Sequence, residues 1–284
     1  MRRIYILLLS IASFAGAVSC GEAPKRVEEA PKLADYGSEF IENANRGLRM
    51  KMIFVQGGTF QMGATSEQGS DAYDNERPVH AVTLDSYYIA ESEVTQAQWQ
   101  AVMGSTVHEK CDLAGGGNTL HGVGYDYPMY YVTWREAQDF CVRLSEMTGK
   151  NYVLPTEAQW EYAARGGRHG QRCKYSGSND VNAVAWYKPN SNKDTHPVMQ
   201  KMPNELGLYD MSGNVYEWCN DLYSGYTYEP QIDPKGGMSG GKYIVRGGCV
   251  TSSDQGCRVS NRYRNSPAER GYGCGFRVAC LLTE

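Results

Sequence analysis

The sequence reads LPTEAQWEYAARGG over residues 154–167 and GLYDMSGNVYEW over residues 207–218. In the first stretch Thr156 and Gln159 have the spacing of a capping box, in which each side chain bonds the other residue's backbone N–H at the start of a helix. Trp160, Ala163 and Ala164 then supply an apolar face, and paired glycines end the pattern. This stretch therefore predicts a short, capped helix.

Two more capping boxes precede this helix in the chain. They are formed by Thr95 with Gln98 and by Thr133 with Glu136, and the second is followed by apolar residues at helical spacing. Cys141 lies on that apolar face, so we expect it in the core. Helices are predicted after all three threonines.

Short strands are predicted before the first helix. Apolar residues alternate around a glycine turn over residues 52–63, and residues 79–84 and 87–89 have similar patterns. After residue 167 short apolar pieces are separated by Gly, Asn, Pro and Ser, and no further helix is expected. No repeat or compositional break is visible from residue 50 onward, so we expect one α+β domain, with two domains as the alternative.

The composition is that of a globular chain with a slight acidic excess. Of 284 residues, 41% are hydrophobic and 21% are charged, which excludes a wholly disordered, fibrous or polytopic membrane protein. Lys and Arg number 28 against 32 Asp and Glu, a net charge of -4, so we expect no nucleic-acid partner. The 21 Tyr and 32 Gly residues favour a loop-rich fold with a recognition surface.

The amino terminus has the pattern of an export signal. Two arginines precede the apolar residues 4–11, and small residues then lead to Cys20. The apolar run is too short for an ordinary membrane span, and a cysteine directly after small residues resembles a bacterial lipobox. We expect a signal peptide over residues 1–19, a lipidated Cys20 with a tether over residues 20–48, and a folded domain over residues 49–284. Plain secretion with a coincidental cysteine is the alternative.

Eight cysteines remain after Cys20. Export permits disulfides, but the pairing is left open by the sequence. No CxxC pair or Cys/His cluster has zinc spacing, and the five histidines are scattered. We therefore expect no zinc site.

Four segments resemble the formylglycine-generating enzyme (sulfatase-modifying factor) family. They are the two stretches quoted above, MIFVQGGTFQMG at residues 52–63, and RGG at residues 246–248 with GFR at residues 275–277. They occur in the family's order and extend over nearly the whole folded domain. The resemblance implies a C-type-lectin-like fold in its formylglycine-generating-enzyme variant, with few helices and strands and much irregular loop.

The resemblance also allows the catalytic residues to be checked. Enzymes of this family oxidise a sulfatase cysteine with two cysteines five positions apart, a copper ion and oxygen. Counting from RGG, the second position is Cys257, but the first is Ser252. Serine forms no disulfide, and copper(I) prefers soft thiolates, so we expect no copper and no formylglycine-generating activity. The iron-dependent sulfoxide synthases of the family would need clustered histidines, which this sequence lacks.

Residues 210–217 (DMSGNVYE) resemble a calcium loop of the same family. The resemblance implies a structural calcium ion held by the carboxylates of Asp210 and Glu217 and the carbonyls of Gly213 and Val215. Calcium prefers such hard oxygen donors. The alternative is that the two carboxylates only form hydrogen bonds within the turn.

The carboxyl-terminal residues, from about 246 to 284, resemble the variable region of proteins that retroelements diversify, the Treponema variable proteins among them. The framework is CRVSNR at residues 257–262, Ser266 with Pro267, and GFR at residues 275–277. In that class adenine-directed mutagenesis rewrites the codons between framework residues. The resemblance implies a ligand-binding surface made of Val250, Thr251, Ser252, Ser253, Asp254, Gly256, Tyr263, Arg264, Gly271, Tyr272, Gly273 and Cys274.

The residue types at these positions are typical of adaptable binding surfaces. Tyrosine rings give contact area for few frozen torsions, and small polar side chains supply hydrogen bonds. The alternative is that they are ordinary solvated loop residues.

Three functions remain open on the sequence alone. The favoured one is a lipoprotein anchored through lipid to the bacterial envelope, on the outer membrane and exposed at the surface, that binds an unknown protein or surface ligand without catalysis. The second is a formylglycine-generating oxidase that acts on a sulfatase cysteine. The third is a structural lipoprotein of a secretion or motility assembly.

Overall fold

A computed structural model describes residues 37–43, 48–115, 117–237 and 240–282. The expected signal peptide, the lipidated Cys20 and most of the expected tether lie outside the described residues. No helix in the described part of the chain is long and apolar enough to cross a membrane.

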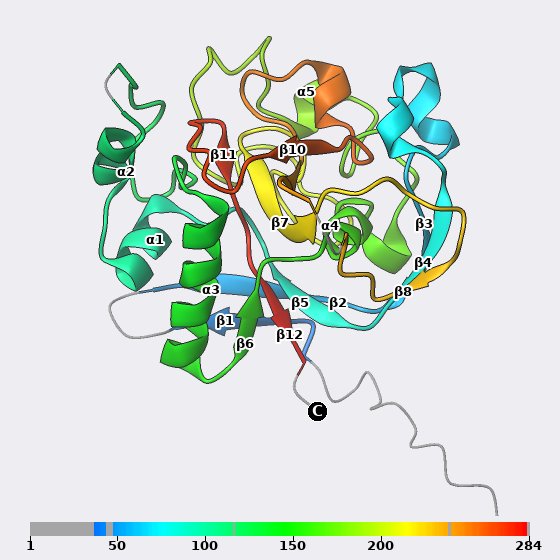
Figure 1. Ribbon diagram of the computed structural model, residues 1–284, viewed down its shortest axis with the longest axis horizontal. Helices are drawn as coiled ribbons and strands as arrows, with labels where there is room; N and C mark the ends of the chain where they lie inside the picture. The colour runs from blue at the N-terminus through cyan, green and yellow to red at the C-terminus, as the bar shows by residue number, and fades with distance from the viewer. Residues whose placement is uncertain (1–36, 44–47, 116, 238–239, 283–284) are drawn as a thin grey trace, which may run out of the picture. The chain divides into compact units, whose positions relative to one another are not determined.

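The largest sheet has five strands and joins the two ends of the described chain (Figure 1). Every neighbouring pair in it is antiparallel. Its order is β1 (Glu39–Glu42), β2 (Met50–Val55), β5 (Tyr87–Ala90), β12 (Ala279–Leu281) and β6 (Asn151–Val153). The last strand of the chain therefore lies inside the sheet, between β5 and β6.

Two smaller sheets complete the β structure. One has the order β10 (Tyr263–Asn265), β9 (Tyr243–Arg246), β7 (Tyr216–Leu222) and β11 (Cys274–Gly275). The other has the order β3 (Gly58–Met62), β4 (His80–Leu84) and β8 (Gln231–Ile232). The strands predicted over residues 52–63, 79–84 and 87–89 correspond to β2, β3, β4 and β5.

The amino-terminal boundary of the folded domain was predicted too late in the chain. Strand β1 belongs to the region assigned to the tether, yet its residues pair with β2 from Glu39↔Ile53 to Glu42↔Met50. Phe40 also packs on Tyr88, with ring centroids 4.9 Å apart. The folded unit accordingly includes β1.

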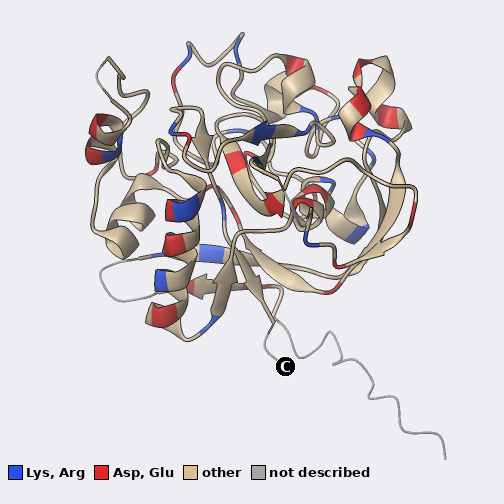
Figure 2. Ribbon diagram, viewed as in Figure 1, with Lys and Arg blue, Asp and Glu red and all other residues tan. Residues whose placement is uncertain are grey.

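The three predicted helices are present with their capping boxes. They are α1 (Gln96–Met103), α3 (Trp134–Thr148) and α4 (Glu157–Ala164), each begun by the expected threonine. On α3 four side chains are buried in the main core, namely Ala137, Phe140, Cys141 and Leu144, whereas Met147 is exposed. In Figure 2 acidic and basic residues both occur along the ribbon of this helix.

Several helical segments were not predicted. No helix is expected from the sequence at α2 (Val107–Leu113), although Thr106 and Glu109 form the same capping box there. The prediction that helices cease after residue 167 was wrong, because Asp180 caps the short α5 (Val181–Val184) by accepting from Asn182 N at 3.0 Å. Single 3-10 turns are η2 (Ser66–Asp71), η3 (Asp74–Glu76), η4 (Gly167–His169) and η5 (Asp254–Cys257).

Four fully buried ion pairs connect the carboxyl-terminal region to the rest of the fold. All four arginines belong to residues 246–277, and all four glutamates precede them in the chain. The pairs are Arg246 with Glu161, Arg258 with Glu76, Arg262 with Glu157, and Arg277 with Glu217.

The pair between Arg258 and Glu76 illustrates how such charges are satisfied. Arg258 Nη1 donates to Glu76 Oε2 at 2.7 Å, and neither side chain is exposed. Burial alone would raise the pKa of Glu76, but the hydrogen bonds from Arg258 and Ser260 hold it below its usual range. The carboxylate is therefore ionised in the core and holds η3 against the segment after η5.

Replacing Glu76 by glutamine should destabilise the protein strongly, because the Arg258 guanidinium would stay buried without a counter-charge. We expect a loss of about 3–5 kcal/mol in the free energy of unfolding, measured by chemical denaturation. Glu39→Gln is the control, since Glu39 is 49% exposed where it pairs with Lys51 and should lose less than about 1 kcal/mol. Similar losses for both variants would contradict the importance of burial.

Candidate functional site

The region predicted to be variable occupies one end of the fold. Strands β10 and β11 lie on the two edges of the four-stranded sheet, and η5 connects β9 toward β10. In Figure 1 these carboxyl-terminal elements, coloured orange to red, gather near α5 and above β7. The predicted framework and the predicted ligand positions can therefore be compared on one surface.

The framework residues 257–262 and 275–277 are buried, whereas Ser266 and Pro267 are half-buried. Arg262 donates to both Glu157 oxygens, at 2.6 and 2.7 Å, and its guanidinium lies 3.7 Å from the centroid of the Tyr226 ring. Arg246 donates to the carbonyls of Val259 and Ser260 at 2.9 and 3.0 Å. These bonds fix the backbone on both sides of the predicted ligand positions.

Asp221 supports the anchor formed by Glu157 and Arg262. Its Oδ2 accepts from the backbone N–H of Glu157 at 2.9 Å at the start of α4. Burial, together with the neighbouring Glu157 carboxylate, raises the pKa of Asp221 to about 8. The carboxyl therefore remains largely protonated near neutral pH.

The predicted ligand positions differ in depth. Five are exposed: Thr251, Ser253, Asp254, Tyr263 and Arg264. Five are half-buried: Ser252, Gly256, Gly271, Tyr272 and Gly273. Most of the set is thus accessible from solvent on one end of the sheet.

Two of the predicted ligand positions are corrected by the structure. Val250 is fully buried, and its backbone N–H donates to Asn214 O at 3.0 Å while its carbonyl accepts from Ser191 Oγ at 2.7 Å. Cys274 is 3% exposed and belongs to the main core, where β11 pairs with β7. Neither side chain can contact a ligand in this arrangement.

Aromatic residues outside the predicted set complete the surface. Tyr216 stacks on Tyr263 with centroids 5.5 Å apart and accepts from Ser252 Oγ at 3.2 Å. The guanidinium of Arg264 lies 4.2 Å from the Tyr223 ring centroid. His121 stacks on Tyr272 at 4.0 Å. The high tyrosine content was the only sequence signal for the two unassigned tyrosines.

The two positions of the family's cysteine pair do not form a thiol site. Ser252 stands at the first position, and its hydroxyl lies 3.6 Å from the thiol of Cys249. Cys257 at the second position is fully buried, and burial with the neighbouring Cys249 and Asp254 raises the pKa of its thiol. Because a protonated, buried thiol is a poor nucleophile and metal ligand, these residues do not fit a copper ion.

The predicted calcium residues lie around a buried acidic cluster. Glu217 accepts from Arg277 Nε and Trp160 Nε1, both at 2.7 Å. Asp210 Oδ2 accepts from Met199 N at 2.8 Å, whereas its Oδ1 is buried without a partner. Gly213 adopts a φ of +86°, and a Cβ there would lie 2.4 Å from a backbone oxygen. The turn therefore requires glycine at this position.

A third acid in this cluster was not predicted from the sequence. Glu93 is buried and accepts from Val215 N at 3.0 Å and from Asn214 Nδ2 at 2.8 Å. Burial and the carboxylates of Asp210 and Glu217 raise the pKa of Glu93. Burial likewise raises the pKa of Asp210 to about 6. Among these three acids the Arg277 guanidinium donates hydrogen bonds to Glu217 alone, while Arg277 and Lys201 both favour the charged form of Asp210.

Comparisons with known proteins agree with the family predicted from the four segments. Residues 38–281 match the family described as "Sulfatase-modifying factor enzyme 1-like domain". Formylglycine-generating enzyme of Streptomyces coelicolor is 30% identical over 285 residues, 80% of this chain and 88% of that protein. Serine/threonine-protein kinase Pkn1 of Chlamydia trachomatis is 33% identical over 250 residues, 82% of this chain and 38% of the kinase. The chain thus spans about two fifths of the length of such kinases.

A solved structure supplies the fold comparison. Treponema denticola variable protein 1 superposes with a TM-score of 0.75 and 30% identity, covering 87% of this chain and 100% of that one. The predicted α+β fold, C-type-lectin-like in its formylglycine-generating-enzyme variant, is confirmed, as is the predicted likeness to a variable protein.

Asp221→Asn should flatten the pH dependence of stability. An unfolded aspartate releases its proton near pH 4, whereas the folded protein holds this proton to about pH 8. The stability contributed by the protonated carboxyl is therefore fully present below about pH 4 and is lost as the pH rises through 8. Denaturation at successive pH values should show a shallower decline for Asp221→Asn than for the wild type.

Asp139→Asn, on the exposed side of α3, is the control for this measurement and should keep the wild-type decline. If Asp221→Asn also kept it, the assigned protonation of Asp221 would be wrong.

Proposed function

The chain belongs to the sulfatase-modifying factor enzyme 1-like family, and we propose that it is a non-catalytic, lipid-anchored surface protein that binds ligands through a diversified carboxyl-terminal surface. The observation that carries the proposal is the contrast in depth within residues 250–274. Framework arginines are buried in ion pairs, while the residues between them are mostly open to solvent.

Such a contrast is what a diversified binding site requires. Exposed substitutions usually change stability little, whereas removal of a buried ion-pair partner is costly. Thr251, Ser253, Asp254, Tyr263 and Arg264 can therefore vary on a fixed scaffold. The stacked pair of Tyr216 and Tyr263 adds rigid aromatic area that suits recognition of a protein or surface ligand.

Absence of catalysis is part of the proposal. The enzyme relative from Streptomyces coelicolor favours an oxidase as the second candidate function. Against it stands Ser252 at the first cysteine position, together with the buried Cys257 thiol. A serine there supplies neither a disulfide partner nor a soft metal ligand.

Anchoring through Cys20 is also proposed, on the lipobox-like sequence that precedes it. Several acyl chains would hold the protein firmly, because a single chain binds membranes only marginally. Surface display follows if the anchor is in the outer membrane and the domain faces outward.

Sequencing the 3′ end of the gene across related isolates tests the proposed diversification. We expect replacements to concentrate at the five exposed positions and at the half-buried ones, with the codons for Arg258, Asn261, Arg262, Val250 and Cys274 unchanged. An invariant stretch, or replacements scattered equally over buried and exposed codons, would contradict a diversified receptor.

A matched pair of variants tests the same contrast in the purified protein. Arg264→Ala removes an exposed side chain and should lower the free energy of unfolding by less than about 1 kcal/mol. Arg262→Ala leaves Glu157 buried without its main partner and should cost about 3–5 kcal/mol. Equal losses would mean that both arginines belong to the framework.

We further propose that a structural calcium ion binds at the loop of residues 210–217, with the carboxylates of Asp210 and Glu217 as ligands. The described residues hold no group of three or more His, Cys, Asp or Glu side chains placed to bind a metal, so the support is Asp210 Oδ1, a hard oxygen donor without a partner among the described residues. The carbonyls of Gly213 and Val215 would be further ligands, as the family resemblance implies.

Calcium should raise the melting temperature of the wild type, and a chelator should reverse the rise. Asp210→Asn should abolish this response, and it is preferable to Glu217→Ala because it leaves the pair with Arg277 intact. An undiminished calcium response in Asp210→Asn would sink this site.

A further inference from the structure

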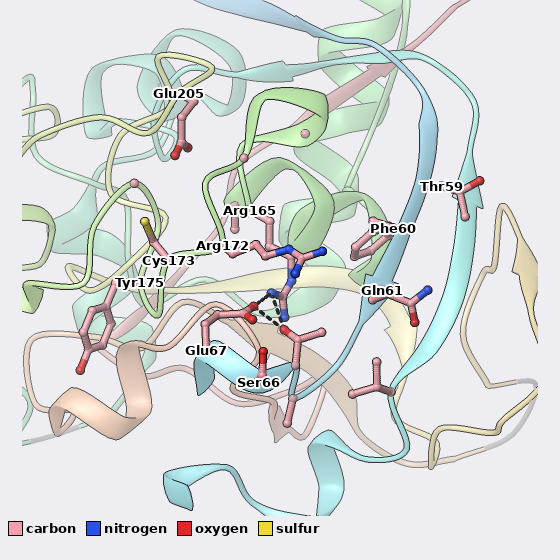
Figure 3. A pocket seen from close by; sticks show the side chains of 17 residues that line it. Thr59, Phe60, Gln61, Ser66, Glu67, Arg165, Arg172, Cys173, Tyr175 and Glu205 are labelled. Atoms are coloured by element: carbon pink, nitrogen blue, oxygen red, sulfur yellow. Dashed lines mark hydrogen bonds and ion pairs between the residues drawn. The ribbon is translucent and has the colours of Figure 1, made fainter. Parts of the chain in front are cut away.

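A cavity of about 560 Å³ is lined by Tyr175, which packs with Cys257 at the end of η5 (Figure 3). It is bounded by β3, η2, the end of α4 and residues 170–177, and none of the twelve predicted ligand positions lines it. Cavities of about 300–1,000 Å³ are typical of small-molecule sites. Its charged groups indicate what kind of molecule it would hold.

Glu205 is a carboxylate that the chain leaves poorly satisfied. Its Oε1 accepts one hydrogen bond, from Gln171 N at 3.3 Å, and its Oε2 is buried with no partner. A Cβ on Gly166 would lie 2.4 Å from Oε2, so a side chain there would displace the carboxylate. Glu205 is half-buried and has no counter-charge among the described residues, and a cationic group in the cavity beside Oε1 would supply one.

Arg172 is the complementary group. Arg172 is exposed, and its guanidinium makes no hydrogen bond or ion pair with any residue in the described ranges, while the backbone N–H of Gln171 beside it donates to Glu205. Its φ of +56° is unusual for a residue with a side chain. In the view of Figure 3 its side chain extends toward the middle of the cavity, with Glu205 on one side and Phe60 on the other.

The other charges of the cavity are already paired. Arg165 Nη1 donates to Glu67 at 2.7 Å and Nη2 lies 2.9 Å from Glu161. Cys173 stays neutral, because burial and the carboxylates of Glu205 and Glu67 raise the pKa of its thiol. The cavity therefore offers one unpaired acid and one unpaired base.

Apolar groups form the remaining wall. Phe60, Ala64, Val79 and Ala164 line the cavity, and Phe60 is fixed against Tyr162 with centroids 5.1 Å apart. A ligand that fits all three features carries an ammonium group, a carboxylate and a modest apolar side chain.

We propose that this cavity binds a small zwitterion, an amino acid or a dipeptide, with its ammonium group on Glu205, its carboxylate on Arg172 and its side chain against Phe60. Binding needs no catalysis and is independent of the proposed variable surface. Glu205 and Arg172 carry opposite charges and have no ion-pair partner in the described residues. In this proposal the two charged groups of the ligand are their partners.

Calorimetric titration of the purified full chain with glycyl-leucine tests the proposal. We expect saturable binding that weakens at least tenfold in Glu205→Gln and in Arg172→Gln. N-acetyl-glycyl-leucine and glycyl-leucinamide, which each lack one charge, should bind the wild type at least tenfold more weakly. Arg143→Gln and Glu146→Gln, exposed residues of α3, are matched controls and should bind as the wild type does.

The folded state of each variant is checked by its melting temperature, which Glu205→Gln should not lower because it removes an uncompensated charge. No saturable heat with glycyl-leucine in the wild type would overturn the proposal. The proposal would also be overturned if the capped peptides bound the wild type as tightly as glycyl-leucine does. The same holds if Glu205→Gln and Arg172→Gln bound glycyl-leucine as tightly as the wild type does. Loss of binding in Arg264→Ala instead would move the site to the variable surface.

Discussion

The fold depends on four buried arginines that each need a glutamate from an earlier part of the chain. An ionised group in the core is tolerated only when a counter-charge and hydrogen bonds replace its water. In this structure each of the four meets that requirement with a different glutamate, namely Glu161, Glu76, Glu157 and Glu217. The pairs therefore fix where the carboxyl-terminal region passes over the sheets, even though much of that region has no regular secondary structure.

These pairs specify position more than they add stability. Replacing a whole buried pair with apolar residues is often neutral, whereas removing one partner is not. A framework built in this way can hold intervening loops of many sequences in one arrangement. The arrangement agrees with the likeness to Treponema denticola variable protein 1.

Local signals in the sequence predicted local structure well. The capping boxes at Thr95, Thr133 and Thr156 each begin a helix, because that motif acts within one turn of the chain. The capping box at Thr106 does not by itself predict a helix, since no apolar repeat follows it. Strand β1 could not be recognised because its pairing partner, rather than its own pattern, makes it a strand.

The order of framework and ligand positions along the chain could be predicted from the sequence, but the burial of each side chain could not. Resemblance separated framework from intervening positions, yet Val250 and Cys274 proved to be core, since burial depends on neighbours such as Asn214 and β7. Glu93 belongs to the acidic cluster, and Tyr223 belongs to the surface beside Arg264. Both come from distant segments, and nothing near them in the chain marks that role. The position of β12 has a separate consequence. Because this last strand fills the gap between β5 and β6, the largest sheet cannot be completed until every residue before it has been accommodated. A chain in which β12 failed to insert would leave the facing edges of β5 and β6 unpaired, and exposed strand edges favour aggregation and proteolysis. Closure of the largest sheet thus depends on the folding of the whole region that precedes β12.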